Sequence, residues 1–249
     1  MGMMVTFIRK TIYMTIDDGP SVQMLKKLDV LEKYNIPAIL FLRGEYMKRY
    51  GKETIQAIQR GFWIANHSYN HPYFSKICFE DACDQIMRTE KYIKALYEQA
   101  EVERPCKLFR FPFLDKGGIN QTRLQQFLKH QKFQRPTFSG ILYQYFHHRN
   151  LGSDIDVPYT YDGCEYALFS CAYRKKYGLL TSKDLVKRLY RNDPENGFGL
   201  CSKSNDIVLL HDFEETHYIF ELLIDSLAMQ PVNFSFPTIC SSDKGDCRF

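Results

Sequence analysis

The chain has 249 residues, 45% of them hydrophobic and 25% charged, with a formal net charge of +4 from 33 basic and 29 acidic side chains. This balance is typical of a globular protein and excludes a disordered or membrane-embedded chain. No apolar run approaches the roughly 18 residues that span a bilayer, and no basic block is long enough for an arm that binds nucleic acid.

Short apolar runs alternate with amphipathic segments along the chain, which predicts repeated β-α units and a mainly parallel sheet. The predicted strands cover residues 11–16, 38–42, 62–66, 108–111, 207–210 and 233–236. Apolar residues at helical spacing predict helices over residues 25–31, 55–60, 79–96, 122–129, 182–190 and 216–228. We expect Ser182 to cap the helix that it begins.

The stretch over residues 134–200 is the least regular, and the dipeptides Asp193-Pro194 and Asn196-Gly197 predict turns within it. The chain contains no internal repeat, linker or low-complexity segment. We therefore predict one domain over residues 1–249, with a core at about 11–237 and a short tail at 238–249.

The first ten residues contain an apolar stretch too short for the core of a signal peptide, and no small-residue cleavage site follows. We therefore expect a cytoplasmic protein, or a secreted one whose leader has been removed.

Asp17 and Asp18 end the first predicted strand, and a Gly-Pro turn follows them. Two adjacent carboxylates are costly to keep together unless a cation or a shared proton relieves their repulsion. The carboxyl ends of parallel strands are also where α/β proteins assemble their sites. Taken alone, however, Asp-Asp-Gly is an everyday turn sequence.

His67 and His71 follow the third predicted strand and are four residues apart. At this spacing two histidines lie on one face of a helical turn, where their ring nitrogens can bind a single metal ion. Two histidines and one aspartate leave coordination positions open, as a catalytic metal site requires.

Arg110 and His211 end two further predicted strands. A guanidinium can form a bidentate pair with a carboxylate, although an arginine at a strand end without such a role is the alternative. Histidine is the natural general acid near neutral pH, although His211 could be purely structural. All four motifs lie at the ends of predicted strands, which favours one shared site over four unrelated coincidences.

Together these motifs resemble the polysaccharide deacetylase (NodB homology) family, carbohydrate esterase family four. T-I-D-D-G-P at residues 15–20 is similar to the family's T-F-D-D-G-P, and residues 67–72 match H-[ST]-x-x-H-P. Residues 110–113 match R-x-P-[FY], and residues 209–211 match L-x-H. The resemblance runs from about residue 11 to 237 and implies an α/β fold, a distorted (β/α) barrel of mainly parallel strands.

The resemblance also implies a role for each matching residue. Asp17 would be the general base, tethered by Arg110, and His211 the general acid. The metal ligands would be Asp18, His67 and His71. The backbone N–H near Phe113 would help to hold the oxyanion, and Leu209 would shape the pocket for the acetyl methyl group.

The fourth motif of the family, an Asp-Trp pair after an earlier Asp, has no unaltered match. We align Asp156 with the earlier Asp, and Tyr159-Thr160 with the pair. Asp156 then becomes the expected carboxylate that tunes His211, with Asp162 or Asp154 as substitutes.

We therefore expect a metal-dependent hydrolase that removes N-acetyl groups from an N-acetylglucosamine-type glycan and releases acetate. One divalent ion is implied, zinc first, although cobalt, nickel, manganese or iron also suits these ligands. The alternatives are an O-acetyl esterase acting on a xylan-type glycan, a cyclic-amide hydrolase, and a non-catalytic glycan-binding relative. The cyclic-amide hydrolase is disfavoured because such relatives tend to lose metal ligands. We expect an acetylated carbohydrate as partner and no nucleic acid, while the oligomeric state is not indicated.

Overall fold

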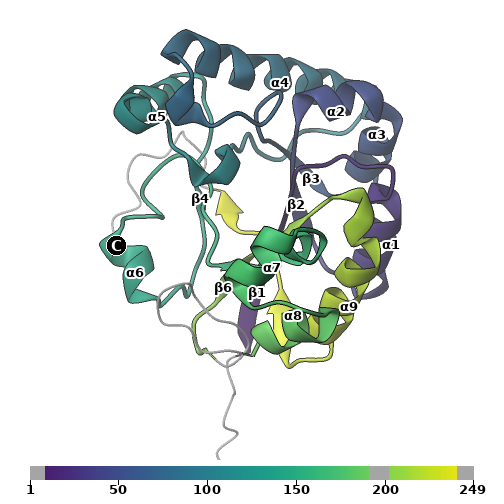
Figure 1. The fold of residues 1–249 in the computed structure, drawn as a ribbon. Coiled ribbons are helices and arrows are strands. Elements are labelled where there is room, and N and C mark those ends of the chain that lie inside the picture. The colour runs from purple at the N-terminus through teal and green to yellow at the C-terminus, as the bar shows by residue number, and fades with distance from the viewer. Residues whose placement is uncertain (1–8, 191–201, 240–249) are drawn as a thin grey trace, which may run out of the picture.

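The computed structural model of the chain describes residues 9–190 and 202–239. Its centre is a sheet of six strands, and every pairing in that sheet is parallel. The strand order is β3 (Trp63–Asn66), β2 (Ala38–Leu42), β1 (Lys10–Asp17), β6 (Asp206–His211) and β5 (Tyr161–Asp162), with β7 (Val232–Phe234) also paired to β1. The predicted α/β fold of mainly parallel strands is confirmed (Figure 1).

The three central strands are mostly apolar because both of their faces are covered. All residues of β2 and β6 are buried, as are the last six of β1. The register pairs Asp17 with Phe41 on one side and with His211 on the other. The ends of β1, β2 and β6 therefore meet at one edge of the sheet.

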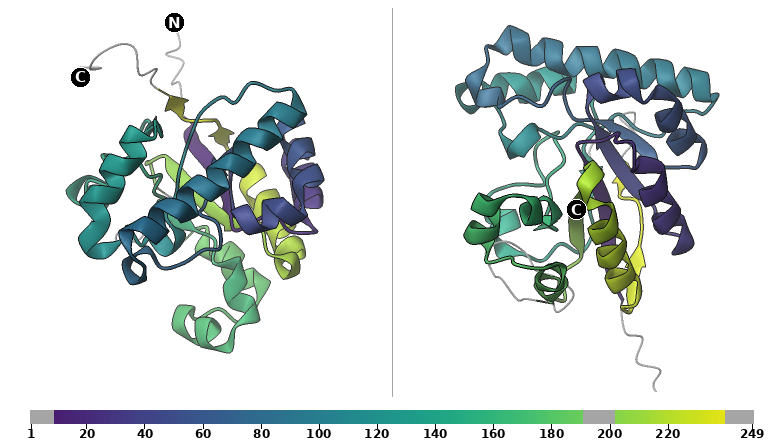
Figure 2. Two further views of the ribbon diagram at one scale, coloured as in Figure 1. Left: turned by 90° about the horizontal axis from the view of Figure 1, so that it is seen from above. Right: turned by 45° about the vertical axis from the view of Figure 1, so that its right-hand side comes forward.

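Nine α-helices accompany the sheet in the part of the chain that the structure covers. They are α1 (Met24–Lys33), α2 (Gly44–Arg49), α3 (Gly51–Gln59), α4 (Phe79–Ala100), α5 (Gln121–His130), α6 (Gln144–His148), α7 (Cys171–Tyr177), α8 (Ser182–Arg188) and α9 (His217–Ala228). Seen from above, α4 crosses diagonally over the strands, while the green α7–α8 segment projects from the body (Figure 2). None of the described helices has the length and apolar character that a membrane span requires.

Five of the six predicted strands correspond to β1, β2, β3, β6 and β7, and all six predicted helices are present. The strand predicted at residues 108–111 was wrong: Phe109 forms only an isolated parallel bridge with Asn66. Pro112 and the left-handed backbone of Phe113 turn the chain away immediately afterwards, so the ladder stops.

Two further expectations concern helix ends and turns. The cap of α8 is Thr181 rather than Ser182, because the Thr181 backbone N–H and hydroxyl both donate to the Asp184 carboxylate. The turns predicted at Asp193-Pro194 and Asn196-Gly197 lie outside the described residues. The segments not predicted are short ones: α2, α6, α7, β5, and the antiparallel pair β4 (Pro136–Thr137) with β8 (Thr238–Ile239).

Candidate active site

A pocket of about 610 Å³ opens at the sheet edge where these strands end. Its size lies within the range of ordinary small-molecule sites. The structure brings together most of the side chains that the sequence singled out, and the pocket is lined by Asp17, Asp18, His67, His71, Arg110, Phe113, Asp162, Leu209 and His211. The exceptions are Asp154 and Asp156, which do not line it.

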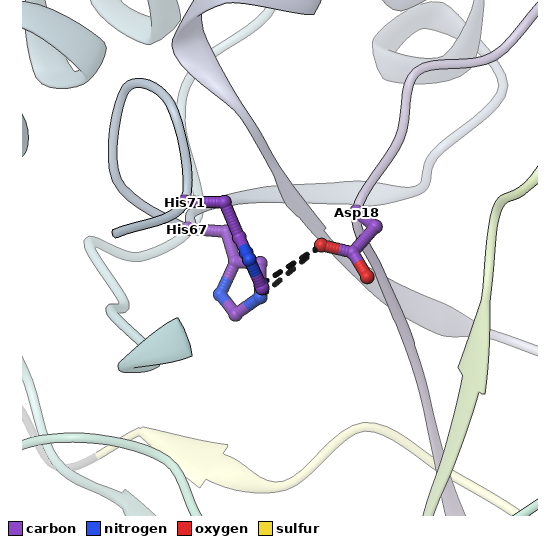
Figure 3. Close-up of side chains that lie close together, drawn as sticks. All are labelled: Asp18, His67 and His71. Atoms are coloured by element: carbon purple, nitrogen blue, oxygen red, sulfur yellow. Dashed lines mark ion pairs between the residues drawn. The ribbon is translucent and has the colours of Figure 1, made fainter. Parts of the chain in front are cut away.

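Asp18, His67 and His71 form a compact group that could hold a metal ion (Figure 3). Asp18 Oδ1 lies 3.0 Å from His71 Nε2 and 3.8 Å from His67 Nε2. This oxygen is buried and has no hydrogen-bond partner among the described residues. A buried carboxylate oxygen without a hydrogen bond, facing two imidazole nitrogens, fits a cation between the three.

The protonation of the two imidazoles also suits ligation. His67 Nδ1 lies 2.9 Å from the backbone oxygen of Arg110, so that Nδ1 donates and Nε2 keeps its lone pair toward Asp18. Desolvation by burial lowers the pKa of both His67 and His71 to about 3. Both rings are therefore neutral at physiological pH, as metal-binding imidazoles must be.

The two histidines meet on a loop rather than on the helical turn expected from their spacing. The backbone of Asp18, Ser68 and His71 is left-handed, with φ values of 71°, 65° and 62°. Each such residue costs on the order of 1–3 kcal/mol and persists only where its surroundings enforce it. Here Asn66 accepts from the Ser68 N–H, and Ser68 Oγ accepts from the His71 N–H.

Arg110 contacts Asp17 through one guanidinium nitrogen only, so the expected bidentate pair was wrong. Its Nη1 donates to Asp17 Oδ1 at 2.7 Å and to Thr15 Oγ1 at 2.9 Å. The other guanidinium nitrogens donate to the backbone oxygens of Val157 and Pro158, each at 2.9 Å. Desolvation raises the pKa of Asp17, and the Arg110 charge opposes that rise. The second oxygen of Asp17 lies 3.5 Å from His67 Nε2.

Glu165, which the sequence argument did not single out, is the carboxylate in contact with His211. Its Oε1 lies 3.4 Å from His211 Nδ1 and also accepts the backbone N–H of His211. Burial lowers the pKa of His211, but the charges of Glu165 and Asp162 outweigh it and raise that pKa to about 10. His211 therefore carries a positive charge at neutral pH.

Asp156 lies elsewhere, which corrects the expectation that it tunes His211. It accepts a hydrogen bond from Gln125 at 2.6 Å and pairs with Lys116 at 3.3 Å. Asp154 also pairs with Lys116, at 2.7 Å. Neither carboxylate is among the main causes of the pKa shift of His211, which are burial and the charges of Glu165, Asp162 and Asp18.

The fourth motif therefore lies six residues later than the first alignment put it. Asp162, Glu165 and Tyr166 keep the spacing of the earlier Asp and the Asp-Trp pair, with Glu for Asp and Tyr for Trp. Asp162 ends β5, and the Tyr166 ring meets the His211 ring edge-on at 4.8 Å. An acid next to an aromatic residue three positions after an Asp was the available signal, and it was missed because both members are replaced.

A buried ion pair joins the backbones that carry Asp18 and His211. Lys27 Nζ lies 3.0 Å from Asp212 Oδ1, and both side chains are 1% exposed. Lys27 also donates to the backbone oxygens of His211 and Phe213, at 3.2 and 2.7 Å. Asp212 accepts the backbone N–H and the hydroxyl of Ser21, each at 2.7 Å. The pair therefore ties the loop after β1 to the end of β6.

Known proteins resemble this chain over part of its length. A family model described as polysaccharide deacetylase matches residues 5–131, just over half of the chain. The peptidoglycan-N-acetylglucosamine deacetylase of Bacillus cereus is 33% identical over 86 residues, which cover 34% of this chain and 31% of that protein. The peptidoglycan-N-acetylmuramic acid deacetylase PdaC of Bacillus subtilis is 34% identical over 113 residues, covering 45% and 22%. The match therefore spans less than a third of either relative.

Solved structures share the fold over most of the chain. Peptidoglycan deacetylase PdaC from Bacillus subtilis has a TM-score of 0.59 at 21% identity, covering 91% of this chain and 87% of that one. A family 4 carbohydrate esterase from Streptomyces lividans, in complex with acetate, has a TM-score of 0.60 at 20% identity, covering 91% and 92%. These likenesses show the shared fold, and the family model over more than half of the chain shows that it belongs to the polysaccharide deacetylase family.

Proposed function

We propose that this protein is a metal-dependent hydrolase that removes N-acetyl groups from an N-acetylglucosamine-type glycan and releases acetate. One observation carries the proposal: a tethered carboxylate, a metal-binding group and a cationic histidine line a single pocket. Asp17 lies beside Asp18, His67 and His71, and His211 lies opposite Asp17 on the neighbouring strand. These are a base, a cation site and an acid around one space.

Asp18, His67 and His71 would hold one divalent ion, with zinc the first choice and cobalt, nickel or manganese also suited to two imidazoles and a carboxylate. The buried Asp18 oxygen without a hydrogen bond and the two neutral rings fit such an ion. When bound, the ion supplies Lewis-acid polarisation of the acetyl carbonyl and lowers the pKa of a water.

Asp17 would take the proton from the attacking water. Arg110 holds Oδ1, so that Oδ2 is the oxygen left on the side of the histidines. Burial raises the pKa of Asp17, and a carboxylate with a raised pKa is a stronger base than a solvated one. The backbone N–H near Phe113, at the rim of the same pocket, would donate to the developing oxyanion.

His211 would protonate the leaving nitrogen. Nδ1 faces Glu165, which leaves Nε2 as the nitrogen that can donate to a substrate. Glu165 acts through His211, since it holds the ring orientation and keeps the imidazolium stable. An amine leaves poorly without a proton, whereas an alkoxide leaves more readily. A histidine that is protonated at neutral pH, because its pKa is raised to about 10, supplies the proton that the N-acetyl reaction needs more than the O-acetyl one does.

The O-acetyl esterase remains the second candidate, because a bifunctional xylanase/deacetylase of Pseudobutyrivibrio xylanivorans is 35% identical over 118 residues. The hypothesis of a non-catalytic glycan-binding protein has less support. A mutant of a pseudoenzyme of the same carbohydrate esterase family shares the fold with a TM-score of 0.60 at 17% identity, so the fold alone does not decide activity. The contacts of Arg110 with Asp17 and of Glu165 with His211 favour a working site.

The test is acetate release from N-acetylglucosamine oligomers by chelated protein reconstituted with zinc, cobalt or nickel. We expect metal-dependent release by the wild-type protein, none by Asp17→Asn, and normal release by the exposed control Asp84→Asn. Release from acetylated xylan alone would replace the proposal with the esterase. Tight metal binding without release from either substrate would refute both and favour a non-catalytic protein.

A further inference from the structure

A second group of side chains that could hold a metal ion includes the proposed acid. Asp162, Glu165 and His211 each offer one ligand atom, and these atoms lie within 4.8 Å of one another. Asp162 ends β5, Glu165 begins the short 3-10 helix η4 (Glu165–Phe169), and His211 ends β6. This group shares no residue with the first group of proposed metal ligands. The described residues therefore contain two separate groups of this kind.

Two buried atoms of the second group have no hydrogen-bond partner among the described residues. They are Oε2 of Glu165 and Nδ1 of His211. Glu165 is 0% exposed and His211 is 8% exposed. The His211 Nδ1 atom is directed toward Glu165, with Oε1 at 3.4 Å, but the two atoms form an ion pair without a hydrogen bond. Buried polar atoms are nearly always paired, so two such atoms in one group indicate a site for an ion.

The other contacts of the two carboxylates leave one oxygen of each for a ligand. Asp162 Oδ1 accepts the backbone N–H of Cys164 at 2.7 Å, and Glu165 Oε1 accepts the backbone N–H of His211. Asp162 Oδ2 receives only a long hydrogen bond of 3.4 Å from the Tyr166 hydroxyl. The backbone therefore fixes both carboxylates before an ion arrives, which lowers the entropic cost of binding.

The charge and the access of the group also suit a divalent cation. Two buried carboxylates carry two negative charges, of which a proton on His211 offsets one and a nearby Arg188 offsets a part from the Asp162 side. A divalent ion would offset both. Carboxylates and imidazoles are ligands that zinc, manganese, cobalt and nickel accept. Asp162 and His211 line the pocket, so an ion can reach them from the solvent.

We propose that Asp162, Glu165 and His211 bind a second divalent cation, more weakly than the first group, and that this ion inhibits deacetylation. Binding at Nδ1 displaces the proton on that nitrogen into the solvent, which weakens the affinity. The imidazole then becomes a neutral ligand, and loss of its Nε2 proton would leave an imidazolate, so it is a much weaker acid than an imidazolium. The inhibition rests on the proposed function, whereas the binding of a second ion does not.

The first test is equilibrium dialysis of zinc alone against the chelated full chain. We expect one tightly and one more weakly bound zinc ion in the wild-type protein. Asp162→Asn and Glu165→Gln should each weaken the second ion at least about tenfold, or about 1.4 kcal/mol, and leave the first. His71→Ala should weaken the first ion and leave the second. Asp84→Asn, at an exposed carboxylate, is the control and should change neither.

Acetate release from N-acetylglucosamine oligomers over the same range of zinc concentration tests the inhibition. We expect release to rise as the first ion binds and to fall as the second ion binds. In Asp162→Asn, measured against the maximum of that variant, the fall should require at least about ten times more zinc, in step with the weaker binding. Release that does not fall while the second ion binds would overturn the inhibition.

A single bound ion in the wild-type protein, or a second ion that persists unchanged in both Asp162→Asn and Glu165→Gln, would overturn the second metal site. Loss of the second ion in His71→Ala would also overturn it, because that ion would then depend on the first group. Absence of acetate release at every zinc concentration would refute the proposed function and leave the binding result intact. If one variant has lowered thermal stability, the other carries the comparison.

Discussion

Replacing Lys27 by methionine should destabilise the protein more than any change of similar size on the same helix. The substitution keeps the length and most of the volume of the side chain, so that it leaves no large cavity. It removes the cation that faces Asp212 at 3.0 Å, and it removes the donor to the His211 and Phe213 carbonyls and to Thr216 Oγ1.

The expected size of the effect follows from burial. Breaking a buried ion pair by removing one partner costs about 3–5 kcal/mol, because the remaining charge is uncompensated. Asp212 keeps its two hydrogen bonds from Ser21, which places the loss at the lower end of that range. For a chain of this size each kcal/mol lowers the melting temperature by roughly 2–4 °C, so we expect a fall of roughly 6–12 °C.

The measurement is urea unfolding followed by circular dichroism, supported by thermal melting. Lys26→Met is the matched control, since Lys26 is the exposed neighbour on α1 and should change stability by less than about 0.5 kcal/mol. Adding Asp212→Asn to Lys27→Met should recover part of the loss, because it removes the orphaned charge. A Lys27→Met variant within about 1 kcal/mol of the control would refute the reasoning.

Three further predictions concern the pocket. Glu165→Gln should lower the pKa of His211, which Glu165 and Asp162 raise to about 10, so the alkaline fall of deacetylation should begin at lower pH and then amount to about tenfold per pH unit; an unchanged pH profile would exclude Glu165 as the tuning carboxylate. Asp156→Asn should leave that profile unchanged, because Asp156 contacts Gln125 and Lys116; a shifted profile would restore the first alignment. Zinc at 100 times its dissociation constant should stabilise the protein by about 2.7 kcal/mol in thermal melting. His71→Ala removes one ligand and should abolish most of that gain. An equal gain in the variant would place the metal elsewhere.

The sequence predicted the sheet well because its central strands are buried on both faces and appear as short, mostly apolar runs. It also predicted the side chains at strand ends, since parallel strands bring those ends together. The helix α7 was not predicted, because a helix that buries no residue has no apolar periodicity. The same limit applies to the segment after β3, where left-handed residues, rather than a helical turn, bring His67 and His71 together.

Contacts between distant parts of the chain were not predicted from the sequence for a different reason. Glu165 meets His211 across 46 residues of sequence, and Arg110 meets Asp17 across 93. No local pattern reports such a contact. Only the motif spacing could have found Glu165, and it did not because Glu and Tyr stand where Asp and Trp were sought. Arg110 pairs with Asp17 through one nitrogen because its other two nitrogens donate to the carbonyls of Val157 and Pro158. Only the folded backbone brings these carbonyls to Arg110.

Asp17 and His211 are paired across the neighbouring strands β1 and β6. The distance between them therefore does not depend on the segments that form the rest of the pocket. Adjacent strands lie about 4.8 Å apart whatever their side chains, so the backbone distance between the proposed base and acid is set by the hydrogen-bond ladder. Residues 165–177, which include α7 and line another part of the pocket, do not enter that distance. Sequence change in this segment can therefore reshape the pocket while the backbone spacing of the proposed proton acceptor and proton donor stays constant.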